Sequence, residues 1–214
     1  LKEYFDNLEG AATTKNNRRS AMKGVFRYAC DFYGLEKNPM ERIPCFKVQN
    51  TAKKHDMNIY TPKEFMALYN AISPKYEDVK VFLWFLYWTG MRANEARSLT
   101  WNDIDGNVVH IHRQWINGAW HELKTRQSIR DVTIDSKTLE LILSLKEKQM
   151  KSKHYKDDWF VFGGAFQLPY SSMSRIKDEG CDSAGLRRIR IHDLRHSHVS
   201  YLISKGVNIY TISR

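Results

Sequence analysis

Cysteine, proline and long apolar runs are all scarce in this sequence of 214 residues. Its three cysteines are odd in number and show no CxxC spacing, which argues against a disulfide or zinc framework and favours a reduced protein. The longest apolar run, Val79 to Trp88, includes Lys80 and is too short to cross a bilayer. No signal peptide opens the chain, and residues 1–4 have the pattern of a helix interior, so we expect further residues before them. These absences predict a globular, cytoplasmic protein without a membrane anchor.

Negative charge is also in short supply relative to positive charge. Lysine and arginine number 34 against 24 aspartates and glutamates, which gives a net charge of +10. Such an excess favours a polyanionic partner, either a nucleic acid or an anionic membrane surface. Apolar residues make up 42% of the chain, which is enough for an apolar core and too many for a disordered protein. The composition therefore predicts a folded protein with a polyanionic partner.

The first part of the chain, residues 1–43, has a pattern of helices alone. Thr13 or Thr14 can cap a helix over residues 16–33, and Gly34 can end it. The apolar face of this predicted helix comprises Ala21, Val25, Tyr28, Ala29 and Phe32.

A polar, basic stretch at residues 44–58 separates this part from the rest and is typical of a linker. Regular structure restarts at Thr61, where Pro62 suits the first helical position and Glu64 completes a capping box. The predicted helices that follow cover residues 61–72, 76–88, 93–99, 136–151, 171–181 and 192–204. The predicted strands cover residues 107–115, 119–123, 129–134 and 159–162, with a hairpin turn at 117–118. This pattern predicts an α+β fold that is mainly helical, with a small antiparallel three-stranded sheet.

Two short motifs about a hundred residues apart hold the side chains best suited to chemistry. The motif TGMRANEARSL at residues 89–99 places Arg92 at the start of a predicted helix. The motif IHDLRHSH at residues 191–198 places His192 and Arg195 on one face of another. Because the planar fork of arginine bonds phosphate oxygens in pairs and keeps its charge at any working pH, this set suits a single phosphate group.

Other interpretations of these residues remain open. Arg92 taken alone is typical of a surface arginine, and a single histidine such as His192 more often caps a helix or packs in a core. His192 and His196 also have the i, i+4 spacing of a helical zinc site. A zinc protease would need a glutamate where Asp193 stands, and Arg195 would place a fixed positive charge beside the metal. We therefore expect no metal and no other cofactor.

Together the two motifs resemble the signature boxes of the tyrosine recombinases, the phage integrase family. The resemblance covers nearly the whole chain and implies a double-stranded DNA substrate, whose strands are cut and rejoined through a 3′-phosphotyrosyl intermediate. It implies that Arg92 and Arg195 bind the non-bridging oxygens of the scissile phosphate, and that His192 moves a proton or holds an oxygen. Lys124, between two predicted strands, is similar to the lysine that protonates the departing 5′ oxygen in that family.

The resemblance also implies supporting residues. Glu95 matches an acidic position that braces the first arginine, and we expect a packing or bracing role for His196 and for His198. Residues 1–43 resemble the second half of a helical core-binding domain, up to the phrase YACDFYGLEKNP. Its candidate contacts to DNA phosphates are Lys15, Arg18, Arg19 and Lys23.

The sequence departs from the family pattern at the nucleophile. The family places its tyrosine well after the second motif, whereas Tyr201 and Tyr210 lie too close to Arg195 to match it. We therefore expect the nucleophile beyond Arg214. On this interpretation the chain alone is inactive and mostly monomeric, whereas the full-length protein forms a homotetramer on DNA.

The sequence thus predicts part of a core-binding domain at residues 1–43, a linker at 44–58 and a catalytic domain at 59–214 that ends before the nucleophile. The predicted activity is site-specific recombination by the integrase of a phage or mobile element. One alternative is a sequence-specific DNA-binding protein that has the same fold and does not cleave. The other is a metal-dependent hydrolase that uses His192 and His196.

Overall fold

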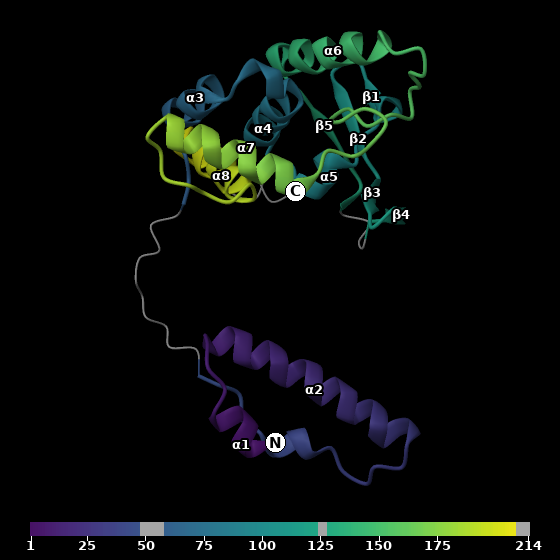
Figure 1. The fold of residues 1–214 in the computed structure, drawn as a ribbon, viewed down its shortest axis with the longest axis vertical. Helices are drawn as coiled ribbons and strands as arrows, with labels where there is room; N and C mark the ends of the chain where they lie inside the picture. Colours follow the sequence, from purple (N-terminus) through teal and green to yellow (C-terminus); the bar gives the residue numbers. More distant parts are fainter. Residues whose placement is uncertain (48–57, 124–127, 209–214) are drawn as a thin grey trace. The chain divides into compact units, whose positions relative to one another are not determined.

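The computed structural model describes residues 1–47, 58–123 and 128–208 (Figure 1). The chain forms two compact units, Leu1–His55 and Asp56–Arg214. Helices dominate the described residues and the strands are few and antiparallel, so the predicted α+β class is confirmed. Within the described part of the chain, no helix has the length and apolar character needed to span a membrane.

The first unit is built on one long helix, α2 (Ala12–Phe32), with the short helix α1 (Lys2–Asp6) and the 3₁₀ turn η1 (Pro39–Arg42). Contacts join η1 to α2. The small apolar core of this unit consists of Phe5, Met40 and Ile43, with Leu8, Met22, Phe26 and Phe46 partly buried around it.

Helix α2 begins four residues earlier than its sequence predicts. Its first residue is Ala12, and neither Thr13 nor Thr14 caps it; Ala11 precedes it without a side-chain hydrogen bond. The positive φ of 113° at Gly10 turns the chain just before that point. Alanine is a strong helix former, so the helix extends back to this turn instead of starting at a threonine cap.

The apolar face predicted for α2 is largely uncovered in the structure. Val25, Tyr28 and Phe32 are 68%, 56% and 70% exposed, and α2 contains no buried residue. The tyrosine and phenylalanine rings contact each other, with centroids 4.7 Å apart. Amphipathic periodicity therefore predicted the helix correctly, but no described residue of this unit buries the predicted face.

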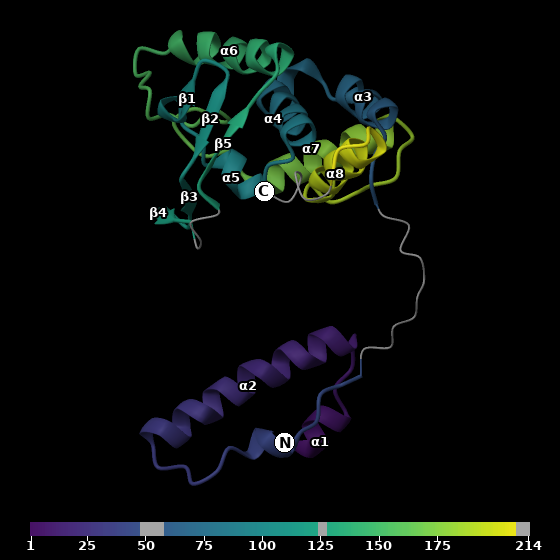
Figure 2. The same ribbon diagram turned by 180° about the vertical axis from the view of Figure 1, so that it is seen from behind.

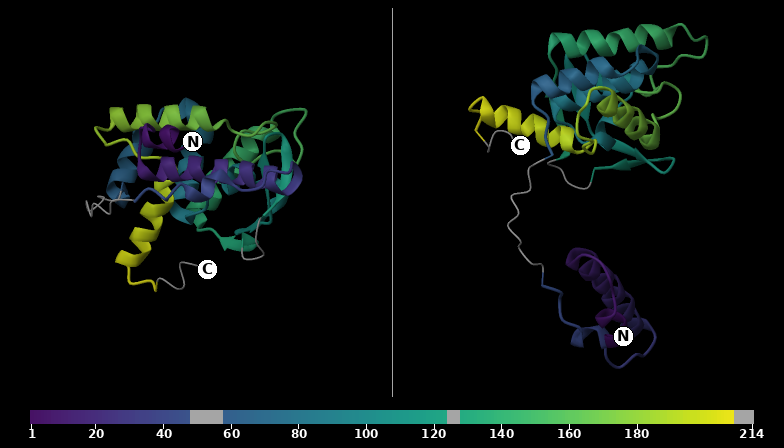
Figure 3. Two further views of the ribbon diagram at one scale, coloured as in Figure 1. Left: turned by 90° about the horizontal axis from the view of Figure 1, so that it is seen from below. Right: turned by 60° about the vertical axis from the view of Figure 1, so that its left-hand side comes forward.

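Helices form most of the second unit, and α4 lies at their centre. Helix α4 packs against five other helices and lies between α6 and α8 in the view of Figure 2. The right-hand view of Figure 3 likewise shows α6 (green) and α8 (yellow) apart, with blue helices between them. Most of its side chains are buried, which explains why its sequence is apolar on all sides. The helices of this unit are α3 (Pro62–Ala71), α4 (Glu77–Thr89), α5 (Ala93–Arg97), α6 (Ser136–Met150), α7 (Tyr170–Ser183) and α8 (Asp193–Ser204), with 3₁₀ turns η2 (Pro74–Tyr76) and η3 (Trp101–Asp103).

Two local predictions in this unit are confirmed in detail. Thr61 caps α3, and its capping box with Glu64 is complete, with the Thr61 N–H donating to the Glu64 carboxylate at 2.8 Å. Asn117 and Gly118 have φ values of 51° and 83° and form the two-residue turn of a hairpin.

The strands pair differently from the prediction. A three-stranded antiparallel sheet is present, but its order is β1 (Ile104–Asp105), β2 (Val108–Ile111) and β5 (Arg130–Thr133). The predicted strand 107–115 is broken at His112, and its second half, β3 (Arg113–Ile116), pairs only with β4 (Ala119–Glu122). The segment 119–123 therefore forms a separate hairpin, because the same extended stretch changes partner along its length (Figure 1).

The predicted strand at residues 159–162 does not form. Phe160 makes only isolated bridges, to Thr100 and to Gly164. The positive φ values of Gly163 and Gly164, 107° and 74°, turn the chain back so that Phe160 bonds to Gly164 instead of to a neighbouring strand.

Candidate functional site

Arg92 lies at a sharp corner between two helices. Helix α4 ends at Thr89, and Gly90, with φ 64°, turns the chain. Met91 is buried and anchors the corner, and Arg92 occupies the N-cap position of α5. Its side chain remains 54% exposed, so a guanidinium projects from a rigid turn into solvent.

Glu95 holds that guanidinium in place. Its carboxylate is only 4% exposed and accepts a hydrogen bond from Arg92 Nη1 at 2.8 Å. The same carboxylate also accepts the Arg92 backbone N–H at 3.2 Å, so it satisfies an N-terminal donor of α5 as well. Glu95 therefore bonds both the side chain and the backbone of Arg92, and its bracing role in a reaction stays a prediction.

A second arginine, which the sequence analysis missed, bonds the same carboxylate. Arg130 Nη2 donates to Glu95 Oε2 at 2.8 Å, and Arg130 Nη1 approaches Oε1 at 3.4 Å. On β5, Arg130 lies on the same side as the partly buried Val132 and the buried Ile134. Sequence alternation could have identified this residue, because Arg130 falls at an inward-facing position of the strand. A guanidinium that is partly buried in this way requires an anionic partner.

Arg195 meets the first motif through the backbone of Gly90. Its Nη1 donates to the Gly90 carbonyl oxygen, two residues before Arg92. Neighbouring His198 Nδ1 contacts the Tyr87 carbonyl oxygen at 2.9 Å, so α8 docks on the carboxyl end of α4. The structure therefore brings the two motifs together, although they are far apart in the sequence.

Gly90 has no room for a side chain at this docking point. A Cβ atom built on it would lie 2.5 Å from Cδ2 of His198. Both the left-handed backbone of Gly90 and the close approach of α8 thus require glycine. His198 therefore packs against the backbone of the corner through Gly90 and Tyr87.

The electrostatics of the cluster favour an anion. Burial lowers the pKa of Arg195, and repulsion from Arg92 lowers that pKa further. Arginine remains charged despite such shifts, so the fold holds like charges close to one another. A pair of this kind creates a positive potential that a phosphate oxygen or other anion would relieve.

His192 is the N-cap residue of α8 and precedes Arg195 by three positions in the sequence. Its ring meets the ring of His196 edge-on, with centroids 4.9 Å apart. Burial lowers the pKa of His192, and repulsion from His196 and Arg195 lowers that pKa further. The imidazole is therefore neutral near pH 7 and able to accept a proton.

The zinc alternative finds no support in the side chains around this pair. Asp193 is 2% exposed and accepts hydrogen bonds from the backbone N–H and the guanidinium of Arg190, so its carboxylate is already bonded. Across the described residues, no cluster of three or more histidine, cysteine, aspartate or glutamate side chains could hold a metal ion.

Lys124 and Tyr210 lie outside the described residues, Lys124 in the range 124–127 and Tyr210 in the range 209–214. The predicted phosphate contacts at residues 15–23 belong to the first unit. In the first unit, Arg19 Nε donates to the Ile43 carbonyl oxygen at 2.6 Å, and Lys15 lies 5.4 Å from the centre of the Phe46 ring. Arg18 and Lys23 are exposed.

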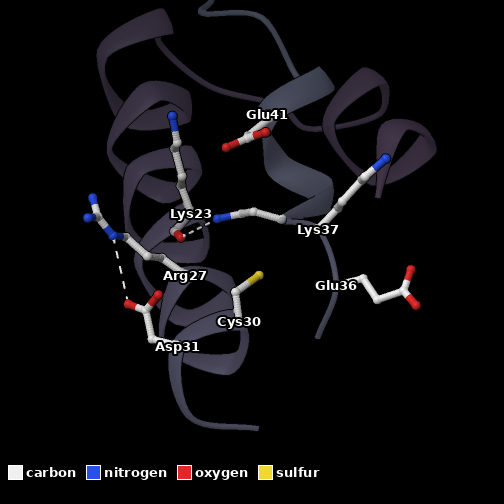
Figure 4. Close-up of a pocket in the computed structure, with 8 residues that line it drawn as sticks. Lys23, Arg27, Cys30, Asp31, Glu36, Lys37 and Glu41 are labelled. Atoms are coloured by element: carbon white, nitrogen blue, oxygen red, sulfur yellow. Dashed lines mark hydrogen bonds and ion pairs between the residues drawn. The ribbon is translucent and has the colours of Figure 1, made fainter. Parts of the chain in front are cut away.

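Lys23 lines a pocket of the first unit that mixes charges of both signs (Figure 4). Two other residues of its lining, Arg27 and Asp31, form an ion pair. Asn38 Nδ2 donates a hydrogen bond to the Lys23 carbonyl oxygen at 3.0 Å. Because its lining includes three basic and three acidic residues, this pocket has no excess of positive charge. Its charged lining residues are Lys23, Arg27, Asp31, Glu36, Lys37 and Glu41.

Comparison with known proteins decides the family. Residues 58–214 match the phage integrase family. The chain belongs to the phage integrase family, that of the tyrosine recombinases. The match includes both motifs, and with them the arginines that the structure brings together.

Relatives extend the likeness to the first unit. The ICEBs1 integrase of Bacillus subtilis (strain 168) is 30% identical over 209 residues, which are 92% of this chain and 56% of that protein. The tyrosine recombinase XerC of Pediococcus pentosaceus is 24% identical over 220 residues, which are 98% of this chain and 68% of that protein. The chain thus spans little more than half the length of the first of these relatives.

The fold is shared with a solved integrase. The Tn1549 transposon integrase (residues 82–397), in complex with circular intermediate DNA, superposes with a TM-score of 0.70 at 16% identity. The superposition covers 99% of this chain and 74% of that one. At this identity the likeness shows the fold alone.

Proposed function

We propose that this chain is part of a site-specific DNA recombinase, an integrase that cuts and rejoins double-stranded DNA. The observation that supports this most directly is the hydrogen bond from Arg195 to the Gly90 carbonyl oxygen, which brings the arginines of two distant motifs to one place. The net charge of +10 and the relatives named as integrases, one of them from a transposon, agree with a DNA substrate and with a mobile element.

In the proposed reaction, Arg92 and Arg195 bind the non-bridging oxygens of the scissile phosphate. The transition state spreads negative charge over these oxygens, and two fixed guanidiniums stabilise that charge more than the charge of the ground state. Neutral His192 accepts or returns a proton, and Lys124 gives a proton to the departing 5′ oxygen. His196 supports His192 through its ring contact. The nucleophile is a tyrosine C-terminal to α8, to which no residue of this chain is assigned.

The domain roles are part of the same proposal. Residues 59–214 act as the catalytic domain, and residues 1–43 contribute to a core-binding domain joined by the linker 44–58. Arg18 and Lys23 are the exposed members of the proposed phosphate contacts, whereas Lys15 and Arg19 also make contacts within their own unit. The full-length protein would act as a homotetramer, and this chain alone would be monomeric and inactive.

The decisive experiment uses the full-length protein and a nicked duplex with its recombination site, selected beforehand by binding from a random pool. Cleavage on such a substrate traps the protein covalently, because the released short strand diffuses away and cannot be rejoined. We expect a covalent protein–DNA band on a denaturing gel. Arg92→Ala and Arg195→Ala should each reduce its rate of formation at least about 100-fold while leaving the circular dichroism spectrum unchanged.

Arg175→Ala is the matched control. Arg175 is an exposed arginine of α7 that pairs with Glu179, so its loss removes one positive charge without touching the cluster. It should form the band at nearly the wild-type rate. Normal cleavage by either site variant would refute the assignment, and no band with DNA binding intact would identify a non-cleaving DNA-binding protein.

A further inference from the structure

Glu95 is shared by two arginines in the catalytic unit. Arg92 and Arg130 bond its carboxylate from different parts of the chain, each with one contact of 2.8 Å. The carboxylate is 4% exposed, so water contributes little to neutralising it. Its charge must be balanced by these guanidiniums.

The Glu95 carboxylate affects phosphate binding by Arg92 in two opposite ways. It orients Arg92, but it also cancels the charge that Arg92 would offer to a phosphate. Arg130 removes that conflict, because its two Nη atoms face both oxygens of Glu95. Three guanidiniums, of Arg92, Arg130 and Arg195, against one carboxylate leave a net charge of +2 in the cluster.

Arg130 is placed to act through Glu95 and not on a ligand. Its side chain is 21% exposed, against 54% for Arg92. Nη1 also donates to the Ser128 carbonyl oxygen at 3.2 Å, so both ends of its fork are bonded within the protein. Arg92 therefore presents the more accessible charge, and Arg130 is the partly buried counter-ion behind it.

We propose that Arg130 is a positioning residue for the reaction: it neutralises Glu95, so that Glu95 holds Arg92 in place without cancelling its charge toward the scissile phosphate. This inference rests on the proposed function. The phosphate gains negative charge on the way to the transition state, so losing the counter-ion should slow cleavage more than it weakens DNA binding.

The test is a double-mutant cycle in the full-length protein. Four proteins are compared: wild type, Arg130→Ala, Glu95→Gln and the double variant. The measurement is the single-turnover rate of covalent complex formation at saturating protein, at a temperature where circular dichroism shows all four folded. The dissociation constant of each for the same duplex is measured in parallel.

We expect Arg130→Ala to slow cleavage at least about tenfold, with the dissociation constant changed less than about threefold. The double variant should cleave faster than Arg130→Ala and match Glu95→Gln, because removing the carboxylate charge removes the need for its counter-ion. Arg130→Lys, which keeps the charge and loses the fork, should cleave at a rate closer to wild type than Arg130→Ala.

Arg113 and Asp103 provide the matched control cycle. Asp103 is also 4% exposed and lies 3.7 Å from Arg113, an arginine of β3. Arg113→Ala should leave the saturated cleavage rate within about threefold of wild type in folded protein. Adding Asp103→Asn to Arg113→Ala should therefore not raise the rate, unlike adding Glu95→Gln to Arg130→Ala.

Three outcomes would overturn the inference. A double variant as slow as Arg130→Ala, or slower, would mean that Arg130 acts independently of Glu95. Rescue of the melting temperature without rescue of the rate would mean that its role is structural only. If wild type itself forms no covalent complex while it binds DNA, the proposed function fails, and the inference fails with it.

Discussion

The buried carboxylate of Glu95 determines how one residue of the site responds to acid. Burial raises the pKa of Glu95, but hydrogen bonds from Arg130 and Arg92 outweigh burial and hold that pKa below its ordinary value. A carboxyl group whose pKa is lower in the folded than in the unfolded state stabilises the fold above its unfolded pKa, about 4.3 for glutamate. That contribution is lost as pH falls through the folded pKa.

We therefore expect wild type and Glu95→Gln to differ most in free energy of unfolding at neutral pH. The difference should begin to shrink below about pH 4.3 and continue to shrink as the carboxyl group is protonated. Urea unfolding of both proteins at pH 7 and at successively lower pH measures it. Glu140→Gln, at an exposed glutamate of α6, should show no such convergence, and a constant gap for Glu95→Gln would contradict the expectation.

Arg130 shows the limit of prediction at the scale of single residues. Arg92, His192 and Arg195 could be chosen from the sequence because each lies in a motif whose spacing has chemical meaning. Arg130 lies outside both motifs, and its significance depends on a contact with Glu95, 35 positions away in the chain. Sequence alternation indicates that an arginine faces inward, but only tertiary packing shows which carboxylate it meets.

At the scale of elements, the junction of α4 and α8 depends on Gly90. An alanine there would be strained by the left-handed backbone and would also contact His198 Cδ2 at 2.5 Å. Gly185 offers a close control, because it has the same φ of 64° and nothing within 4 Å of a built Cβ atom.

We expect Gly185→Ala to lower the free energy of unfolding by about 1 kcal/mol, the usual cost of alanine at such a backbone. Gly90→Ala should cost clearly more, by about 1–3 kcal/mol beyond the control, because the added methyl group overpacks the junction. Urea denaturation of both variants measures the difference. Equal costs would show that α8 can shift away from Gly90 without loss.

Elements with strong local signals could be predicted, whereas those set by distant partners could not. The capping box at Thr61 and the turn at Asn117–Gly118 are determined by residues within a few positions of each other, and both are present in the structure. The break at His112 depends on β5 and β4 pairing with different halves of one extended segment. Alternation of apolar and polar residues gives the same pattern for either partner, so the sequence predicted one strand.

At the scale of the whole molecule, net positive charge should govern how the chain binds DNA. The six proposed phosphate contacts, Lys15, Arg18, Arg19, Lys23, Arg92 and Arg195, would release about one counter-ion each. The logarithm of the binding constant should then fall with the logarithm of salt concentration with a slope of about −5. Fluorescence anisotropy with a labelled duplex between 50 and 200 mM salt (about the range where such slopes are measured) tests this.

The exposed Arg18 supplies an internal check on that slope. Arg18→Ala should make the slope shallower by about one unit and weaken binding similarly on all sequences, because a phosphate contact has no sequence information. Binding that is independent of salt would contradict the electrostatic account. An unchanged slope for Arg18→Ala would remove Arg18 from the contacts.

The hydrogen bond from Arg195 to Gly90 spans 105 positions of the chain. During synthesis, the first motif leaves the ribosome before the second. A growing chain that ends within α7 therefore holds Arg92, Glu95 and Arg130 but not yet Arg195. A contact between such distant segments carries the entropic cost of closing a long loop, which is larger than for a local contact. The two arginines proposed to bind one phosphate therefore cannot come together until α8 has been made, so the site is completed only after both motifs are present.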